Sequence, residues 1–122
     1  MMNPVQEAAK SIPRPIHVFD VPSGLDPEVK SVGLIELTAD EELQATRRSH
    51  GDTMRLAYEL VKQAIVDVNG AKVGIADGTV DIALNKMVPK LRQLVMGAYG
   101  ELHAPSEDAS QAFFKSRKVR VG

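Results

Sequence analysis

Three histidines are the residues of this 122-residue chain best suited to binding a metal ion or transferring a proton. His17 lies in a predicted strand, whereas His50 and His103 lie where predicted helices end. They lack the i, i+4 spacing that places two imidazoles on one side of a helix, and the chain contains no Cys. The sequence therefore predicts no metal site and no cofactor, and it assigns His50 and His103 to the capping of helix carbonyls.

Carboxylates and hydroxyls also lack the arrangement of a recognisable catalytic site. Asp40, Glu41 and Glu42 are consecutive, so their side chains point to different sides of a helix. The chain has no Gly-x-Ser-x-Gly elbow, no Walker loop and no Gly-x-Gly-x-x-Gly turn. We therefore predict a protein that is not an enzyme and that works by binding other proteins.

Composition narrows the class of protein. Hydrophobic residues make up 43% of the chain, charged residues 25% and aromatic residues 4%, which is typical of one globular domain with an aliphatic core. No apolar run reaches the ~20 residues that cross a bilayer, and the N-terminus lacks the basic-then-apolar order of a signal peptide. We expect no membrane association and a cytoplasmic location.

Charge is unevenly distributed, although the net charge is only −1. Residues 1–61 carry six basic and ten acidic side chains, whereas residues 62–122 carry nine basic and six acidic ones. Four basic residues fall within the last eight positions: Lys115, Arg117, Lys118 and Arg120. Without interleaved aromatics or a recognition helix, these charges argue against nucleic acid as the main partner, and a solvated tail behind a helix is the alternative.

Hydrophobic patterning predicts an α+β fold that is mainly α, with four or five helices and a short N-terminal β-strand pair. Residues 1–15 contain three prolines and are expected to be flexible. Residues 16–116 form a single, mainly helical domain, and residues 117–122 form a basic C-terminal tail. The two strands are expected at residues 16–21 and 32–37, paired antiparallel.

Capping residues and apolar periodicity predict where two central helices begin and end. Thr38 and Glu41 can form a capping box that starts a helix running to about His50. The next helix is expected to end at Asn69-Gly70, a pair that tolerates left-handed backbone. Its apolar face recurs at helical spacing: Ala57, Leu60, Val61, Ala64, Ile65 and Val68.

The C-terminal third predicts three further helices. A short one begins at Thr79 or Asp81 and ends before Pro89, which suits the first turn of the next helix. Pro105 ends that helix, and Ser106 caps the last one. The apolar residues expected to face the core are Leu91, Leu94, Val95, Ala98 and Leu102 in the longer helix, and Ala109, Ala112, Phe113 and Phe114 in the last.

Two adjacent aromatic residues, Phe113 and Phe114, are candidate anchors for a protein partner. Neighbours on a helix lie about 100° apart, so one ring is expected to be exposed, and burial of both against the N-terminal strands is the alternative. Met54, Met87 and Met96 are further candidates for an adaptable binding surface, with core filling as the alternative. The predicted partner-binding surface also includes Tyr99, Leu102, Lys115, Arg117, Lys118 and Arg120.

A series of short motifs follows the predicted strands. The run Glu-Leu-Thr-Ala-Asp-Glu-Glu at residues 36–42 precedes Ala-Tyr-Glu-Leu at 57–60, Val-Asn-Gly at 68–70 and Lys-Leu-Arg-Gln-Leu-Val at 90–95. In this order the motifs resemble the small tail assembly chaperones of long-tailed bacteriophages. The resemblance covers about residues 16–120.

This resemblance implies a chaperone that binds the tape-measure protein in the host cytoplasm, keeps its long hydrophobic helices soluble and helps to recruit tail-tube protein. The family has no catalytic residues to transfer to this chain. The alternatives are a structural virion protein of the head–tail connector, neck or tail, and a cytosolic DNA-binding regulator. A homo-oligomer is compatible with each of these functions.

Overall fold

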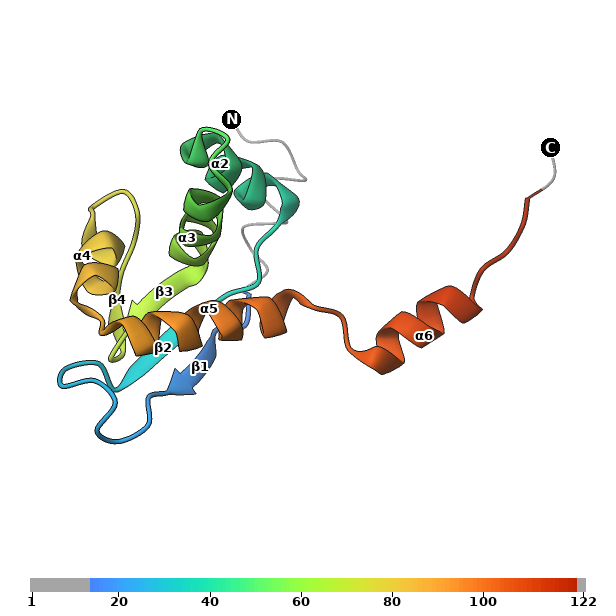
Figure 1. Ribbon diagram of the computed structural model, residues 1–122. Helices are drawn as coiled ribbons and strands as arrows, with labels where there is room; N and C mark the ends of the chain where they lie inside the picture. Colours follow the sequence, from blue (N-terminus) through green and yellow to red (C-terminus); the bar gives the residue numbers. More distant parts are fainter. Residues whose placement is uncertain (1–13, 121–122) are drawn as a thin grey trace, which may run out of the picture.

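A four-stranded antiparallel sheet and the helices around it form the body of the protein (Figure 1). The computed structural model describes residues 14–120. The strands, in their order across the sheet, are β1 (His17–Asp20), β2 (Ser31–Leu34), β3 (Ile65–Val68) and β4 (Ala71–Lys72). The helices are α2 (Ala39–Ser49) and α3 (Thr53–Ala64), between β2 and β3, and then α4 (Thr79–Lys86), α5 (Pro89–His103) and α6 (Glu107–Lys115). This α+β, mainly helical architecture confirms the predicted fold class.

The N-terminal strand pair is present as predicted, though both strands are shorter. β1 and β2 pair antiparallel, with His17 opposite Leu34 and Asp20 opposite Ser31. β2 ends at Leu34, because the next N–H, that of Ile35, donates to the last carbonyl of α3 at 3.0 Å. The strand pair is therefore joined directly to the helical part of the fold.

The third strand corrects the sequence prediction. The apolar pattern predicts a helix that continues to Asn69, but α3 ends at Ala64 and residues 65–68 form β3. Three of the four β3 residues branch at Cβ, which favours extended backbone. Asn69 and Gly70 have φ values of 57° and 79°, as in the tight turn of a β-hairpin. The sheet therefore has four strands, where the sequence predicts two.

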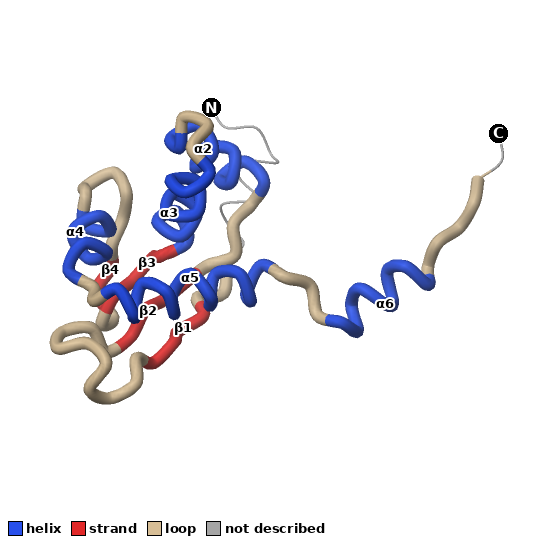
Figure 2. Tube along the Cα trace, in the orientation of Figure 1, coloured by secondary structure: helices blue, strands red, loops and turns tan. Residues whose placement is uncertain are grey.

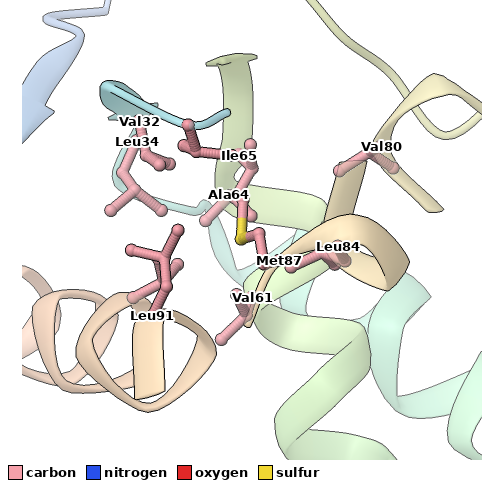
Figure 3. Close-up of a cluster of buried hydrophobic side chains, with 11 residues drawn as sticks. Val32, Leu34, Val61, Ala64, Ile65, Val80, Leu84, Met87 and Leu91 are labelled. Atoms are coloured by element: carbon pink, nitrogen blue, oxygen red, sulfur yellow. The ribbon is translucent and has the colours of Figure 1, made fainter. Parts of the chain in front are cut away.

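One hydrophobic core joins the sheet to α3, α4 and α5 (Figure 3). Leu34 is fully buried, and of the predicted α5 face Leu91 and Val95 are buried as expected. Leu94 is 52% exposed, so its expected place in the core is wrong. The buried core residues are Val29, Val32, Leu34, Val61, Ala64, Ile65, Val80, Leu84, Met87, Leu91 and Val95.

Local sequence signals correctly predict the starts of α2, α4, α5 and α6. Thr38 and Glu41 form the capping box of α2, and this helix ends at His50 in the left-handed conformation. α4 begins at Thr79, and α5 begins at Pro89, whose missing N–H costs nothing in the first turn. These ends depend on residues adjacent in the chain, which explains why the sequence predicts them.

Arg14 is held by side-chain hydrogen bonds, whereas residues 1–15 are expected to be flexible. Its guanidinium donates to both carboxylate oxygens of Glu41 and, at 3.1 Å, to the carbonyl oxygen of Glu36. Burial acts to raise the pKa of the Glu41 carboxyl, but its hydrogen bonds outweigh burial and lower the pKa. The chain is thus anchored at the start of α2 from Arg14 onward, and the rest of that prediction, for residues 1–13, lies outside the described residues.

The buried side chain of Asp26 connects the β1–β2 loop to the start of α5. Its Oδ1 accepts from the N–H groups of Glu28 and Val29 at 2.8 and 2.9 Å, and its Oδ2 accepts from the N–H of Val88 at 3.1 Å. These three hydrogen bonds lower the pKa of Asp26 despite the opposing effect of burial. Val88 directly precedes α5, so the carboxylate satisfies an N–H donor that the helix cannot.

We predict that Asp26→Asn destabilises the protein at neutral pH. The asparagine oxygen can replace Oδ1, but its NH₂ group would face the N–H of Val88. Because the folded-state pKa is lowered, the carboxylate stabilises the fold above its unfolded pKa of about 3.9, and this contribution is lost as pH falls through the folded-state pKa. Chemical denaturation at pH 7 and pH 3 should therefore show a deficit for the variant that shrinks at the lower pH.

Asp20→Asn is the matched control, because it neutralises an exposed carboxylate next to the same loop. It should leave the free energy of unfolding nearly unchanged. An equal deficit for Asp26→Asn at both pH values would contradict the role of the ionised carboxylate.

Candidate partner-binding surface

Helix α6 projects from the body and does not pack on it (Figure 1, Figure 2). The chain leaves α5 through Ala104, Pro105 and Ser106, and no residue of α6 is buried. Ala109 and Ala112 are exposed, so the expected packing of their face on the core is wrong. We refer to the linker, α6 and the basic residues after it, residues 104–120, as the α6 segment.

Local hydrogen bonds at both ends define α6. The hydroxyl of Ser106 accepts from the N–H of Ala109 at 3.1 Å, and two acidic residues occupy the first turn. At the other end, the hydroxyl of Ser116 donates to the carbonyl oxygen of Phe113 at 2.6 Å. A helix of this length is marginal in isolation, so α6 depends on these caps and on any surface that covers it.

The aromatic side chains of Phe113 and Phe114 are both exposed, at 72% and 73%. Their rings meet edge to face, with centroids 5.4 Å apart and planes at 79°. The alternative in which both rings are buried against the N-terminal strands is wrong. One exposed ring is expected, and the structure exposes both, so both are available to a partner.

The basic tail continues from α6 into solvent. Within residues 14–120 the salt bridges use Arg14, Arg48 and Lys62 as cations. The four basic residues of the predicted surface are all exposed and take part in none of those bridges: Lys115, Arg117, Lys118 and Arg120. The α6 segment therefore combines two exposed aromatic rings with adjacent positive charge.

The structure does not bring Tyr99 and Leu102 to this surface. Both lie on α5, are half-buried and pack against the core. The Tyr99 ring stacks on the imidazole of His103 with centroids 4.1 Å apart, and burial, assisted by the carboxylate of Glu42, raises the pKa of its phenol. The predicted site is thus divided between the end of α5 and the α6 segment.

The three histidines lie on different elements, and the structure gives His103 a clear role. Its Nε2 accepts from the N–H of Leu37 at 2.8 Å, so the proton is on Nδ1, which faces the carbonyl oxygen of Tyr99 at 2.9 Å. This confirms the predicted contact with a helix carbonyl. His50 is the C-cap of α2, and His17 lies in β1. Within residues 14–120, no three His, Cys, Asp or Glu side chains gather closely enough to hold a metal ion.

The three candidate methionines divide between core and surface. Met87 is buried among core residues from α4 and α5, so core filling is the correct alternative for it. Met54, at the start of α3, is 86% exposed, and Met96, on α5, is also exposed. They lie on elements other than the α6 segment, so the methionines form no single surface with the aromatic pair.

An apolar cleft between β1 and α5 is a feature that the sequence patterns do not predict. It has a volume of about 460 Å³, and its walls include Phe19 and Val21 from the sheet side and Leu94 and Ala98 from the helix. Its two walls come from segments far apart in the chain, so neither segment indicates it alone. The exposed Leu94 belongs to this cleft, which explains why a residue in the apolar pattern of α5 lies outside the core.

A cluster of charged side chains joins α2, α3 and α4. Buried Glu59 accepts from Arg48 Nε at 2.9 Å, and Lys62 Nζ lies 3.4 Å from Glu59 and 2.9 Å from Asp81. Burial acts to lower the pKa of Lys62, but Asp81 and Glu59 outweigh it and raise the pKa. Tyr58 also reaches Asp81, at 3.5 Å. Because these charges pair with each other across the helices, the cluster supports the fold.

No protein-family model matches this chain, and no curated protein or solved structure matches it either. Within the described part of the chain, every helix is too short or too polar to span a bilayer. The functional proposal therefore depends on the chain's own residues and geometry.

We predict that Glu59→Gln lowers the free energy of unfolding by about 1–3 kcal/mol, because it removes the buried charge that pairs with Arg48 and Lys62. Urea denaturation followed by circular dichroism measures this loss. Glu36→Gln, at an exposed position, is the control and should change stability little. A variant of unchanged stability would contradict a structural role for the cluster.

Proposed function

We propose that this protein is a non-enzymatic binding protein that presents the α6 segment to a protein partner. The observation that carries the proposal is the exposure of both Phe113 and Phe114 on a capped helix that lies away from the body. A partner that covers exposed aromatic rings removes their apolar surface from water, and this burial favours binding. Aromatic residues are also enriched among those that dominate the binding energy of protein interfaces.

The chemistry of the α6 segment defines the kind of partner. Two adjacent rings suit an apolar groove or the apolar face of an amphipathic helix. The basic residues that follow favour acidic groups beside that apolar surface and speed association through long-range attraction. The expected partner is therefore a polypeptide with an apolar surface bordered by negative charge.

The specific function proposed is to chaperone the tape-measure protein during assembly of a long phage tail, in the cytoplasm of the host. The motifs at residues 36–42, 57–60, 68–70 and 90–95 support this proposal through their resemblance to tail assembly chaperones. A tape-measure protein, with its long hydrophobic helices, offers the kind of surface that an exposed aromatic helix binds. Tail-tube protein is the second proposed partner.

We predict that Phe113→Ala combined with Phe114→Ala weakens capture of the tape-measure protein at least about tenfold, because the two rings are the proposed anchors. Affinity capture after co-expression, followed by titration of the purified pair, measures the change. The circular dichroism spectrum should stay close to that of the wild type, since neither ring packs in the core.

Met54→Ala is the matched control, because it also removes an exposed apolar side chain, from a different helix. It should leave capture unchanged. Equal capture by the aromatic double variant and the wild type contradicts the assignment of α6 as the contact. Two other outcomes point to the alternatives: stable retention in purified virions indicates a structural component, and salt-sensitive binding to duplex DNA indicates a regulator.

A further inference from the structure

The cleft between β1 and α5 and the two rings of the α6 segment are both apolar surfaces exposed to solvent. The cleft is open, and its apolar walls include the half-exposed side chains of Phe19 and Leu94. Its volume of about 460 Å³ lies within the range of pockets that bind ligands of side-chain to drug size. The two α6 rings, in contrast, project into solvent as a pair.

The cleft and the residues that follow the aromatic pair also carry opposite charges. The charged residues that line the cleft are Asp20, on the sheet side, and Glu101, on the helix side, and both are acidic. The residues that follow the aromatic pair carry the opposite charge, and all four of these basic side chains are exposed. An α6 segment seated in the cleft would place its positive tail near the two carboxylates.

The linker between α5 and α6 directs α6 away from the body of its own chain (Figure 1). Ala104 precedes a proline, which disfavours helical backbone, and it is extended at φ −85° and ψ 134°. Pro105 has a fixed φ, and Ser106 is extended at φ −63° and ψ 156° because it caps α6. Ala104 and Ser106 are extended and Pro105 between them has a fixed φ, and α6 beyond this linker is directed away from the body (Figure 1).

We propose that two copies of this chain form a symmetric dimer in which the α6 segment of each occupies the β1–α5 cleft of the other. The occupant is a second copy because α6 is directed away from its own body, while its aromatic pair suits the apolar cleft and the basic residues after that pair are opposite in charge to Asp20 and Glu101. Exchange of a terminal helix through a short linker is a common route to a closed dimer. This proposal goes beyond client binding and does not rest on the client's identity.

Two glycines of α5 provide a matched test. A Cβ atom at either Gly97 or Gly100 would meet no neighbouring atom, and replacing a glycine inside a helix favours the helix. Gly97 lines the cleft, whereas Gly100 does not. Gly97→Leu should therefore fill the cleft without disturbing the fold. Gly100→Leu should add the same side chain to α5 at a position outside the cleft. Leu94→Lys, at a half-exposed cleft position, is a second blocking variant.

Sedimentation velocity of the full chain, from about 1 µM to about 1 mM, tests the proposal. The wild type and Gly100→Leu should form a dimer with the same dissociation constant. Gly97→Leu, Leu94→Lys and the Phe113→Ala/Phe114→Ala variant should each raise that constant at least about tenfold, while circular dichroism remains unchanged. High salt should weaken the wild-type dimer, because the cleft and the tail carry opposite charge.

A wild-type chain that stays monomeric over this range overturns the proposal. So does a dimer that neither Gly97→Leu nor Leu94→Lys weakens, because it must use another surface. Client capture separates this inference from the proposed function. Gly97→Leu leaves the α6 segment free, so it should bind tape-measure protein at least as well as the wild type even though it no longer dimerises.

Discussion

The junction at Ala64 and Ile65 is the constraint on which the rest of the fold depends. Helix α3 becomes strand β3 without an intervening loop, and the last helix carbonyl accepts the N–H of Ile35 at 3.0 Å. Ile65 then pairs with Leu34, so one short stretch belongs to the helix, the sheet and the core together. This junction sets the α2–α3 pair at the end of the sheet and directs Val61 toward α4 and α5 (Figure 3).

Polar side chains then hold α5 at both ends. The carboxylate of Asp26 accepts from the N–H of Val88, just before α5. His103, in the last turn of α5, accepts from the N–H of Leu37. Asn69 adds a further connection, since its side chain bonds backbone groups of the β1–β2 loop. With α5 fixed in this way, both the wall of the cleft and the direction in which the chain leaves the body are determined.

The folded core and the proposed binding segment consequently lie in different parts of the chain. The core uses β2, β3 and three helices, whereas α6 depends on its own caps and contributes no buried residue. A short helix of this kind gains more from a covering surface than a helix already packed in a core would. The two proposed contacts of the aromatic pair, with a client and with a second copy, would therefore leave the folded body unchanged.

By itself, the sequence determined the features that depend on neighbouring residues. Thr38, Pro89 and Ser106 mark helix starts through capping and fixed φ, and the strand pair follows from β-branched runs between turns. Residues 65–68 fit a helical period and a strand equally well, and only pairing with β2 decided between the two. Exposure of both α6 rings and the existence of the cleft were likewise decided by tertiary structure, because burial depends on which distant segments meet.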